Sequence, residues 1–271
     1  MPKVILEEEA PQGGDDWYML HVGRPTASNF HRVVTPKELK LSKQRKAFTY
    51  RLAAERLVNF SFDQDLNHIR DIRRGKDEEP EAVKQYASIN DAETYRVSMI
   101  LTDDEKFGCS PDRMVDHLNS STAPAALIHG LEIKSVFLPK MLEFWDVGSG
   151  DAHRIQVLGQ MWVGDMELND LFCYNVAMKP YFCRWKRSEH KSDIETVRGH
   201  MTQFGDELDE LTERMRKLGY FENYARAATI SERREKVEGI KASFGQYVGQ
   251  DAPPDDMNAV DAILRAGNLG G

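Results

Sequence analysis

AALIHGLEIKSVF, residues 125–137, decides both the expected fold and the candidate site. The segment is apolar and β-branched apart from Glu132 and Lys134, which predicts a strand. Side chains at i and i+2 of a strand share a face, so Glu132 and Lys134 should project together while Ile133 faces the core. Because an unpaired charge is costly to bury, these two side chains require a partner or an ion on such an apolar strand.

Two further apolar segments precede this one, VSMILT (97–102) and CSPDRMVD (109–116). Turn residues separate them, which predicts three strands in an antiparallel meander. Asp112 on the middle strand would then reach Glu132, and two carboxylates one strand apart suit Mg²⁺ or Mn²⁺. Lys134 at the rim would polarise a water or neutralise transition-state charge. The alternative is an aspartate in a turn and a Glu–Lys pair on a wet strand face, without an ion.

The rest of the chain predicts helices around this sheet. Apolar periodicity and capping residues indicate helices at 26–33, 44–60, 77–90, 150–165, 189–217 and 230–247. Pro80 suits the first turn of the third of these, where its missing N–H has no partner anyway. LFCYNVAM (171–178) and YFCRWKR (181–187) predict two more strands, split by Lys179–Pro180. This order of elements predicts a mixed α/β or α+β domain.

Composition excludes several classes of protein. With 271 residues, of which 41% are hydrophobic and 30% charged, the chain is typical of a globular protein. It has no stretch of about 18 uncharged apolar residues that would span a membrane. Residues 1–16 lack the features of a signal peptide, so we expect a cytoplasmic protein. Three cysteines without a CxxC pair argue against a disulfide framework, a zinc site and an iron–sulfur cluster.

The net charge of −8 argues against a protein that coats nucleic acid. A nuclease nevertheless combines metal-binding carboxylates with a local basic surface. Residues 37–51 offer a candidate surface that tracks the DNA backbone, the alternative being a solvated helix face. Against one acidic residue, Glu38, this basic segment carries Lys37, Lys40, Lys43, Arg45, Lys46 and Arg51.

Three other segments offer polar groups to the same site. Glu79 lies near a helix N-terminus, where it is either a surface residue matched to the helix dipole or a further metal-binding carboxylate. Gln156 and Gln160 share a helix face and would orient water or a phosphate, unless that face is merely exposed. The third segment precedes a helix and would bind a phosphate or simply cap the helix. Its polar residues are Arg24, Thr26 and Ser28.

Five motifs in register resemble the lambda-type exonuclease family, also called YqaJ-like viral recombinases, within the PD-(D/E)XK nucleases. The resemblance covers about residues 15–187. The motifs are W-x(6)-R-P-T-A-S from Trp17, R-G-x(3)-E-P-x-A from Arg74, G-C-S-P-D from Gly108, L-E-I-K-S from Leu131 and Q-x(3)-Q-M-W-V from Gln156.

The resemblance implies a PD-(D/E)XK nuclease-like core, with a central mixed sheet flanked by helices and extra C-terminal helices. It implies a phage- or prophage-encoded, Mg²⁺-dependent exonuclease that degrades one strand of linear double-stranded DNA from the 5′ end. Mn²⁺ would substitute, with two ions per site. The 3′ single-stranded tail would pass to a single-strand annealing protein for homologous recombination. Family members often form ring-shaped homotrimers, so the expected partners are DNA ends, further copies of the chain and that annealing protein, without a membrane.

The resemblance also implies a role for each motif. Asp112, Glu132 and the Ile133 carbonyl would hold metal, and Glu79 would complete the shell. Lys134 would serve the nucleophilic water. The motif glutamine on the following helix would be Gln156.

A second set of residues would bind DNA. Arg24 and Ser28 would form the 5′-phosphate pocket, with Thr26 beside them. Lambda-like members have an arginine four residues after the tryptophan, where this chain has His21, so Arg24 would take over. Lys43, Arg45 and Gln160 complete the expected DNA contacts.

We therefore expect four parts: a flexible acidic leader (1–14), a nuclease core (15–187), a helical extension packed on the core (188–248) and a flexible tail (249–271). Two other functions remain open. One is a DNA endonuclease or repair nuclease of another PD-(D/E)XK branch. The other is a non-catalytic DNA-binding recombination scaffold with a degenerate nuclease fold.

Overall fold

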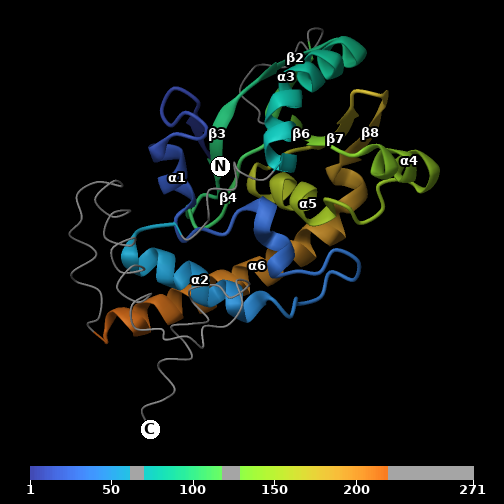
Figure 1. Ribbon diagram of the computed structural model, residues 1–271. Helices are drawn as coiled ribbons and strands as arrows, with labels where there is room; N and C mark the ends of the chain where they lie inside the picture. Colours follow the sequence, from blue (N-terminus) through green and yellow to red (C-terminus); the bar gives the residue numbers. More distant parts are fainter. Residues whose placement is uncertain (62–69, 118–128, 219–271) are drawn as a thin grey trace, which may run out of the picture.

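The computed structural model describes residues 1–61, 70–117 and 129–218, without the side chains of residues 70–73 and 117. The predicted helix at 230–247 and the tail at 249–271 lie outside these residues. Within them, a five-stranded sheet, a three-stranded sheet and surrounding helices form a mixed α/β fold (Figure 1).

The five-stranded sheet is mixed, as the family resemblance implied, and its strand order is β2-β5-β6-β7-β8. The β5–β6 pair is antiparallel, β6–β7 is parallel and β7–β8 is antiparallel. The predicted antiparallel pairing of the Asp112 and Glu132 segments is therefore confirmed. The strands are β2 (Ala92–Tyr95), β5 (Arg113–His117), β6 (His129–Ser135), β7 (Leu168–Asn175) and β8 (Met178–Lys186).

Helices cover both faces of this sheet. On one face α3 (Arg70–Asn90) packs against β2, β6 and β7. On the other lie α4 (Leu138–Val147) and α5 (Arg154–Val163), which contact β7 among other strands. Side-chain alternation along β6 explains the division, because Leu131 and Ile133 join the apolar cluster under α3. Glu132 and Lys134 consequently point toward the face that α5 covers.

A buried ionic group ties α3 to the sheet. Asp170 on β7 is fully buried and accepts hydrogen bonds from Arg184 Nε at 2.9 Å and from the Tyr86 hydroxyl at 2.6 Å. His129 Nε2 lies 3.0 Å from the same carboxylate. Burial alone would raise the pKa of Asp170, but these partners outweigh it and lower that pKa. The group fixes α3 over β6 and β7, next to the strand that carries Glu132.

The second sheet has the order β1-β3-β4 and joins the first through the Asp112 segment. It comprises β1 (Lys3–Leu6), β3 (Val97–Leu101) and β4 (Gly108–Cys109). The expected single strand at 109–116 is wrong: it breaks at 110–112, and the chain crosses from one sheet to the other there. Pro111 has no N–H to donate to a ladder, which is consistent with a break at this point.

The flexible leader expected at 1–14 is also a correction. β1 pairs with β3 in antiparallel register from Lys3 opposite Leu101 to Leu6 opposite Val97. The short α1 (Asp15–His21) follows and contacts β3. The acidic residues 7–9 favoured the prediction of a flexible leader over that of a strand. The apolar run Val4-Ile5-Leu6 finds its partner, β3, only in the folded chain.

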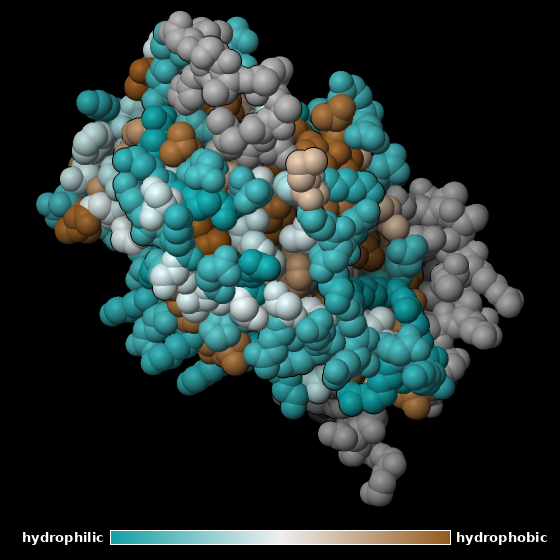
Figure 2. Space-filling model, turned by 180° about the vertical axis from the view of Figure 1, so that it is seen from behind, coloured by the Kyte–Doolittle hydropathy of each residue, from teal (hydrophilic) through white to brown (hydrophobic). Residues whose placement is uncertain are grey.

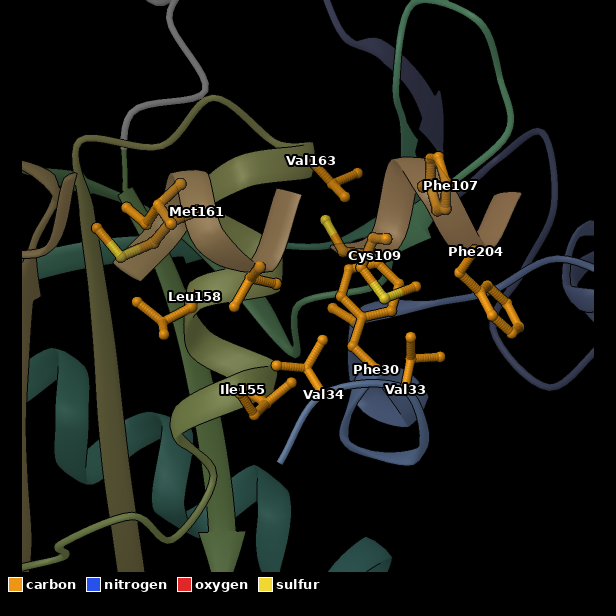
Figure 3. Close-up of a cluster of buried hydrophobic side chains, with 14 of the residues drawn as sticks. Phe30, Val33, Val34, Phe107, Cys109, Ile155, Leu158, Met161, Val163 and Phe204 are labelled. Atoms are coloured by element: carbon orange, nitrogen blue, oxygen red, sulfur yellow. The ribbon is translucent and has the colours of Figure 1, made fainter. Parts of the chain in front are cut away.

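The main hydrophobic core lies between the second sheet and the helices. It joins the 3-10 helix η1 (Ala27–Arg32), α2 (Arg45–Val58), α5 and α6 (Arg187–Arg216). Figure 3 shows Phe30, Val33 and Cys109 near the centre of this core, with Leu158 of α5 on one side of them and Phe107 and Phe204 on the other. The Phe48 and Phe204 rings stack with centroids 5.6 Å apart. Because α6 supplies core residues, residues 188–216 of the expected extension are part of this core rather than an addition to its surface.

Two predicted boundaries involving proline are wrong. α3 begins at Arg70, so Pro80 lies inside the helix and not in its first turn. Pro180 lies inside β8 and does not split it from the preceding segment; the turn falls at Val176–Ala177 instead. β8 is the edge strand of this sheet in the described part of the chain, where a residue without an N–H is tolerated because one side of the strand has no partner strand there.

The outer surface is largely hydrophilic on the face shown in Figure 2, with hydrophobic residues scattered among polar ones. Among the described helices, none has the length and apolar character needed to cross a membrane. All three cysteines are free: Cys109 and Cys173 are buried and Cys183 is half-buried.

Candidate active site

Glu132 is the centre of the candidate site. It is only 2% exposed, yet three side chains donate hydrogen bonds to its carboxylate. Lys134 Nζ and Gln156 Nε2 reach Oε1 at 2.5 and 2.7 Å, and Gln160 Nε2 reaches Oε2 at 2.5 Å. The predicted same-face arrangement of Glu132 and Lys134 is confirmed, as is the shared face of the two glutamines. The partner that a charge on this apolar strand requires is present.

Lys134 is held as a cation at this site. Burial alone would lower the pKa of its ammonium group, but the nearby Glu132 and Asp112 carboxylates outweigh that effect and raise the pKa. Its side chain is 26% exposed, so Lys134 lies at the rim of the site, whereas Glu132 is almost completely enclosed. A fixed positive charge of this kind suits the stabilisation of developing negative charge on a phosphate.

Asp112 lies at the crossing between the two sheets and reaches β6. Its Oδ2 accepts the backbone N–H of Ile133 at 2.7 Å. Burial and the charge of Glu132 raise the pKa of Asp112 to about 8, against the opposing effects of Lys134 and the Ile133 N–H. Two carboxylates in one partly buried place repel each other, and a divalent cation would relieve that repulsion.

The donor set fits one hard divalent cation. Asp112 Oδ1 accepts no hydrogen bond from any described residue and remains available, while Glu132 Oε2 accepts one and keeps a second lone pair. Carboxylate oxygens, a backbone carbonyl and water are the ligands that Mg²⁺ and Mn²⁺ prefer. Asp112 and Glu132 are therefore the residues that would hold it.

Glu79 does not join these two carboxylates in the structure. It lies on α3 and forms ion pairs with Arg113 at 2.7 Å and Arg96 at 2.8 Å. Across residues 1–61, 70–117 and 129–218, no three His, Cys, Asp or Glu side chains are grouped to hold a metal. The structure thus does not show the expected completion of the metal shell by Glu79. The two arginines explain why: they offer Glu79 full positive charges nearby.

Gln160 was grouped with the DNA contacts by motif position, and the structure corrects this. Its side chain is 1% exposed and lies between Glu132 and Asn169, whose Nδ2 donates to Gln160 Oε1 at 2.7 Å. A buried amide of this kind cannot contact DNA. Gln156 is half-buried and remains at the rim of the site.

His153 joins the site although the sequence analysis gave it no role. It precedes α5 and has a φ of 60°, a left-handed backbone conformation that residues other than glycine adopt infrequently. Burial, followed by the positive charge of Lys134, lowers the pKa of His153 to about 4. The imidazole is therefore neutral near pH 7 and leaves Lys134 as the cation of the site. No local sequence signal marks this backbone conformation.

The predicted phosphate pocket is only partly assembled. Arg24 donates from NH1 to the Leu20 carbonyl and from Nε to the Glu105 carbonyl at 3.1 Å, so most of its fork is engaged by the protein. Burial lowers the pKa of Arg24. Thr26 is buried and Ser28 is exposed, with their hydroxyl oxygens 3.1 Å apart. The expected helix is a six-residue 3-10 turn, whose first N–H groups are satisfied by a capping box.

The turn before Arg24 is fixed by α2. Gly23 has a φ of 62° and donates its N–H to the buried Glu55 carboxylate at 2.9 Å. Arg56 Nε donates to the Gly23 carbonyl at 2.7 Å. His21 contacts Trp17: its Nδ1 lies 2.8 Å from the Trp17 carbonyl and its ring packs on the Trp17 ring.

The basic segment at 37–51 is less positive than its composition suggests. Arg45 forms an ion pair with Glu207 of α6, Arg51 pairs with the buried Glu55 at 3.1 Å, and Lys40 pairs with Glu38 at 2.9 Å. Arg45 is thus a tie between α2 and α6 and not the free DNA contact that was expected. The exposed lysines of the segment that carry no such ion pair among the described residues are Lys37, Lys43 and Lys46.

Comparisons with known proteins identify chains of similar fold. Two solved structures of an alkaline exonuclease from Laribacter hongkongensis, one of them in complex with dAMP, each align with a TM-score of 0.59. Each shares 21% identity over 76% of this chain and 100% of that chain. A phage related exonuclease from Haemophilus somnus aligns with a TM-score of 0.48 at 12% identity, over 69% of this chain and 95% of that chain. The likeness to the Laribacter hongkongensis structures shows that the chain shares their fold.

Among curated proteins, no sequence matches this chain. A family model does match: the YqaJ-like viral recombinase domain aligns with residues 16–167. These residues hold Asp112, Glu132, Lys134 and the paired glutamines, and they amount to more than half of the chain. The chain therefore belongs to the family of the YqaJ-like viral recombinase domain.

Proposed function

We propose that this chain is a phage-type exonuclease that hydrolyses phosphodiester bonds of linear double-stranded DNA with Mg²⁺. The observation that carries the proposal is the contact of Lys134 with Glu132 at 2.5 Å, beside Asp112 on the neighbouring chain segment. One acid pair and one lysine, gathered at the central strand β6, form the residue set that metal-dependent phosphodiester hydrolysis requires. Family and fold support the same reaction class.

Each residue has a separate task in this proposal. Asp112 and Glu132 would hold the cation, which when bound lowers the pKa of water and neutralises phosphate charge. Lys134 supplies a fixed positive charge at the rim and restrains the attacking water. Gln156 holds Glu132 Oε1 in place at 2.7 Å and offers a polar side chain to the substrate side. Mn²⁺ would substitute for Mg²⁺, because both prefer oxygen ligands.

The finer features are part of the same proposal. Degradation would proceed from the 5′ end of one strand and leave a 3′ single-stranded tail. An annealing protein would take up that tail in recombination, and several copies of the chain would assemble as a ring, by family resemblance a trimer. A phage or prophage would encode the chain, which would act in the cytoplasm of a bacterial host. These features rest on membership of a viral recombinase family.

The deciding experiment compares four DNA substrates with and without Mg²⁺. Linear duplex labelled at either the 5′ or the 3′ end gives the polarity, and nicked and covalently closed circles test whether an end is required. We expect Mg²⁺-dependent release of the 5′ label as mononucleotide from linear duplex, with the closed circle intact. Cleavage of the closed circle would instead identify an endonuclease of another PD-(D/E)XK branch. Stable DNA binding without nucleotide release would identify a non-catalytic scaffold.

A further inference from the structure

Asn169 lies behind the candidate site, outside every motif that the sequence analysis singled out. It is on β7, next to β6 in the sheet, and its side chain is 0% exposed. Its Nδ2 donates to Gln160 Oε1 at 2.7 Å, and Gln160 Nε2 donates in turn to Glu132 Oε2 at 2.5 Å. Three side chains, each no more than 2% exposed, thus form a hydrogen-bonded relay from β7 through α5 to β6.

The charge of Glu132 fixes the direction of this relay. An ionised carboxylate only accepts hydrogen bonds, so Gln160 must present its NH₂ group to Glu132 and its carbonyl oxygen to the other side. That carbonyl oxygen needs a donor, and Asn169 provides it. If Asn169 could not donate, Gln160 would lose the restraint that keeps its amide from turning over. A turned amide would place a carbonyl oxygen against Glu132 Oε2, where two acceptors repel each other.

The other end of the Asn169 amide argues that this donor is needed. Asn169 Oδ1 is buried and has no hydrogen-bond partner in the described part of the chain. A buried carbonyl oxygen without a partner is unfavourable, and a leucine of similar size would avoid it. The cost is tolerated at a position whose NH₂ group serves Gln160. Gly130 on the neighbouring strand provides space for the Asn169 side chain, because a Cβ at that position would lie 3.3 Å from Asn169 Oδ1.

We propose that Asn169 is a positioning residue of the active site, which acts through Gln160 to hold Glu132 in the orientation that binds the divalent cation. The inference rests on the proposed function, because it assigns Glu132 to that cation. Lys134 and Gln156 already occupy Oε1, so the cation must use Oε2, the oxygen that the relay restrains. Outer residues of this kind orient the ligands of many metal sites.

The test measures Mn²⁺ binding to the full chain by isothermal titration calorimetry, together with the single-turnover rate of DNA cleavage. Asn169→Asp replaces the donor by an acceptor at nearly constant volume. We expect it to weaken Mn²⁺ binding about 10-fold to 100-fold, the range typical of such outer residues. In the Gln160→Met background the same change should cost about twofold or less, because its route to Glu132 is already lost. Equal losses in both backgrounds would overturn the proposal.

Asn169→Leu separates positioning from stability. It removes the unpaired Asn169 oxygen but also leaves Gln160 Oε1 without its donor, so we expect a thermal midpoint close to that of the wild type and weakened Mn²⁺ binding. A merely structural role predicts unchanged Mn²⁺ affinity in this variant, and that result would refute the relay. The leucine variant also serves if Asn169→Asp does not fold.

Asn175→Asp is the matched control. Asn175 lies on the same strand, is 8% exposed and donates to the Val136 carbonyl at 2.7 Å, away from Gln160. Its Mn²⁺ affinity should stay within about twofold of the wild type, since this asparagine holds no ligand side chain; a loss equal to that of Asn169→Asp would overturn the proposal. A wild-type chain that binds Mn²⁺ without cleaving DNA would contradict the proposed function only, because the Mn²⁺ affinities of the variants still test the role of Asn169. A wild type that binds no Mn²⁺ would overturn both.

Discussion

Asp112 reaches across from the junction of two sheets to accept the backbone N–H of Ile133 at 2.7 Å, directly between Glu132 and Lys134 in sequence. This bond uses the backbone of β6 and none of its side chains, and it holds the Asp112 carboxylate next to Glu132. It also places Asp112 close enough to Glu132 for their charges to repel, which contributes to the pKa of about 8 for Asp112. The site is thus electrostatically strained in the metal-free protein and relaxed by a cation.

The first prediction concerns pH and stability. The folded-state pKa of Asp112 lies above the usual value for an aspartate, so the folded chain holds a proton that the unfolded chain has released between about pH 4 and pH 8. Stability should therefore fall as pH rises through this window. Asp112→Asn removes the titration, so in EDTA the variant should become more stable than the wild type as pH rises, by an amount on the order of a few kcal/mol. Urea unfolding at a series of pH values measures the difference.

The control for this prediction is the cation. Saturating Mg²⁺ should make the pH dependence of stability similar in the wild type and in Asp112→Asn, because a bound cation keeps Asp112 ionised in the folded state. If the two proteins show parallel pH curves in EDTA, the repulsion between Asp112 and Glu132 is not what the geometry indicates.

The second prediction concerns Lys134. Lys134→Ala removes the ammonium group that donates to Glu132 Oε1. The single-turnover cleavage rate should therefore fall about 100-fold or more, as it does when one hydrogen-bond donor to a transition state is lost. DNA affinity, measured by gel shift in EDTA, should change little because one ammonium group contributes little to phosphate binding overall. Lys140→Ala is the matched control: this lysine is exposed on α4 and pairs with Glu143 at 2.7 Å. Equal loss of binding and cleavage in Lys134→Ala would remove its catalytic assignment.

The centre of the site could be predicted because its geometry is local. Glu132 and Lys134 share a face through the two-residue period of a strand, and Gln156 and Gln160 through the turn of a helix. Both relations need no knowledge of the fold. Asp112 was found because its segment neighbours β6 in sequence and pairs with it, although the strand that should carry it is broken at Pro111.

The remainder depended on contacts between distant segments. Glu79 pairs with Arg96 and Arg113, and Arg45 with Glu207, and no spacing along the chain indicates these pairs. Asn169 was missed for the same reason, since its role follows from the parallel pairing of β6 and β7. Pro180 was misjudged because only the strand order shows that β8 is an edge.

The third prediction tests the packing that holds α5 over the site. A Cβ at Gly159 would lie 2.7 Å from a ring carbon of Phe30 and 3.1 Å from the Ala27 Cβ. Gly159→Ala should therefore lower the free energy of unfolding by about 1–3 kcal/mol, as overpacking of a buried contact does. Gly199→Ala on α6 is the matched control, because nothing lies within 4 Å of its added Cβ. That variant should gain about 0.5–1 kcal/mol from helix propensity. Similar effects of the two substitutions on the chemical-denaturation midpoint would contradict the close approach of η1 and α5.

The last prediction concerns Arg24 and the DNA end. Its Nε and NH1 donate to the Glu105 and Leu20 carbonyls, which fix the guanidinium and leave NH2 for a phosphate. Arg24→Ala should lower the ratio of cleavage rates on 5′-phosphorylated and 5′-hydroxyl duplex by about tenfold, the size of one lost charge-assisted hydrogen bond. Arg24→Lys keeps the charge but not the fork, so it should restore only part of the ratio. Because both variants lose the carbonyl contacts, each should also unfold at a lower temperature. A variant with the lower thermal midpoint but an unchanged rate ratio would show that Arg24 only braces the turn after Gly23, and the 5′-phosphate would then have to be bound elsewhere.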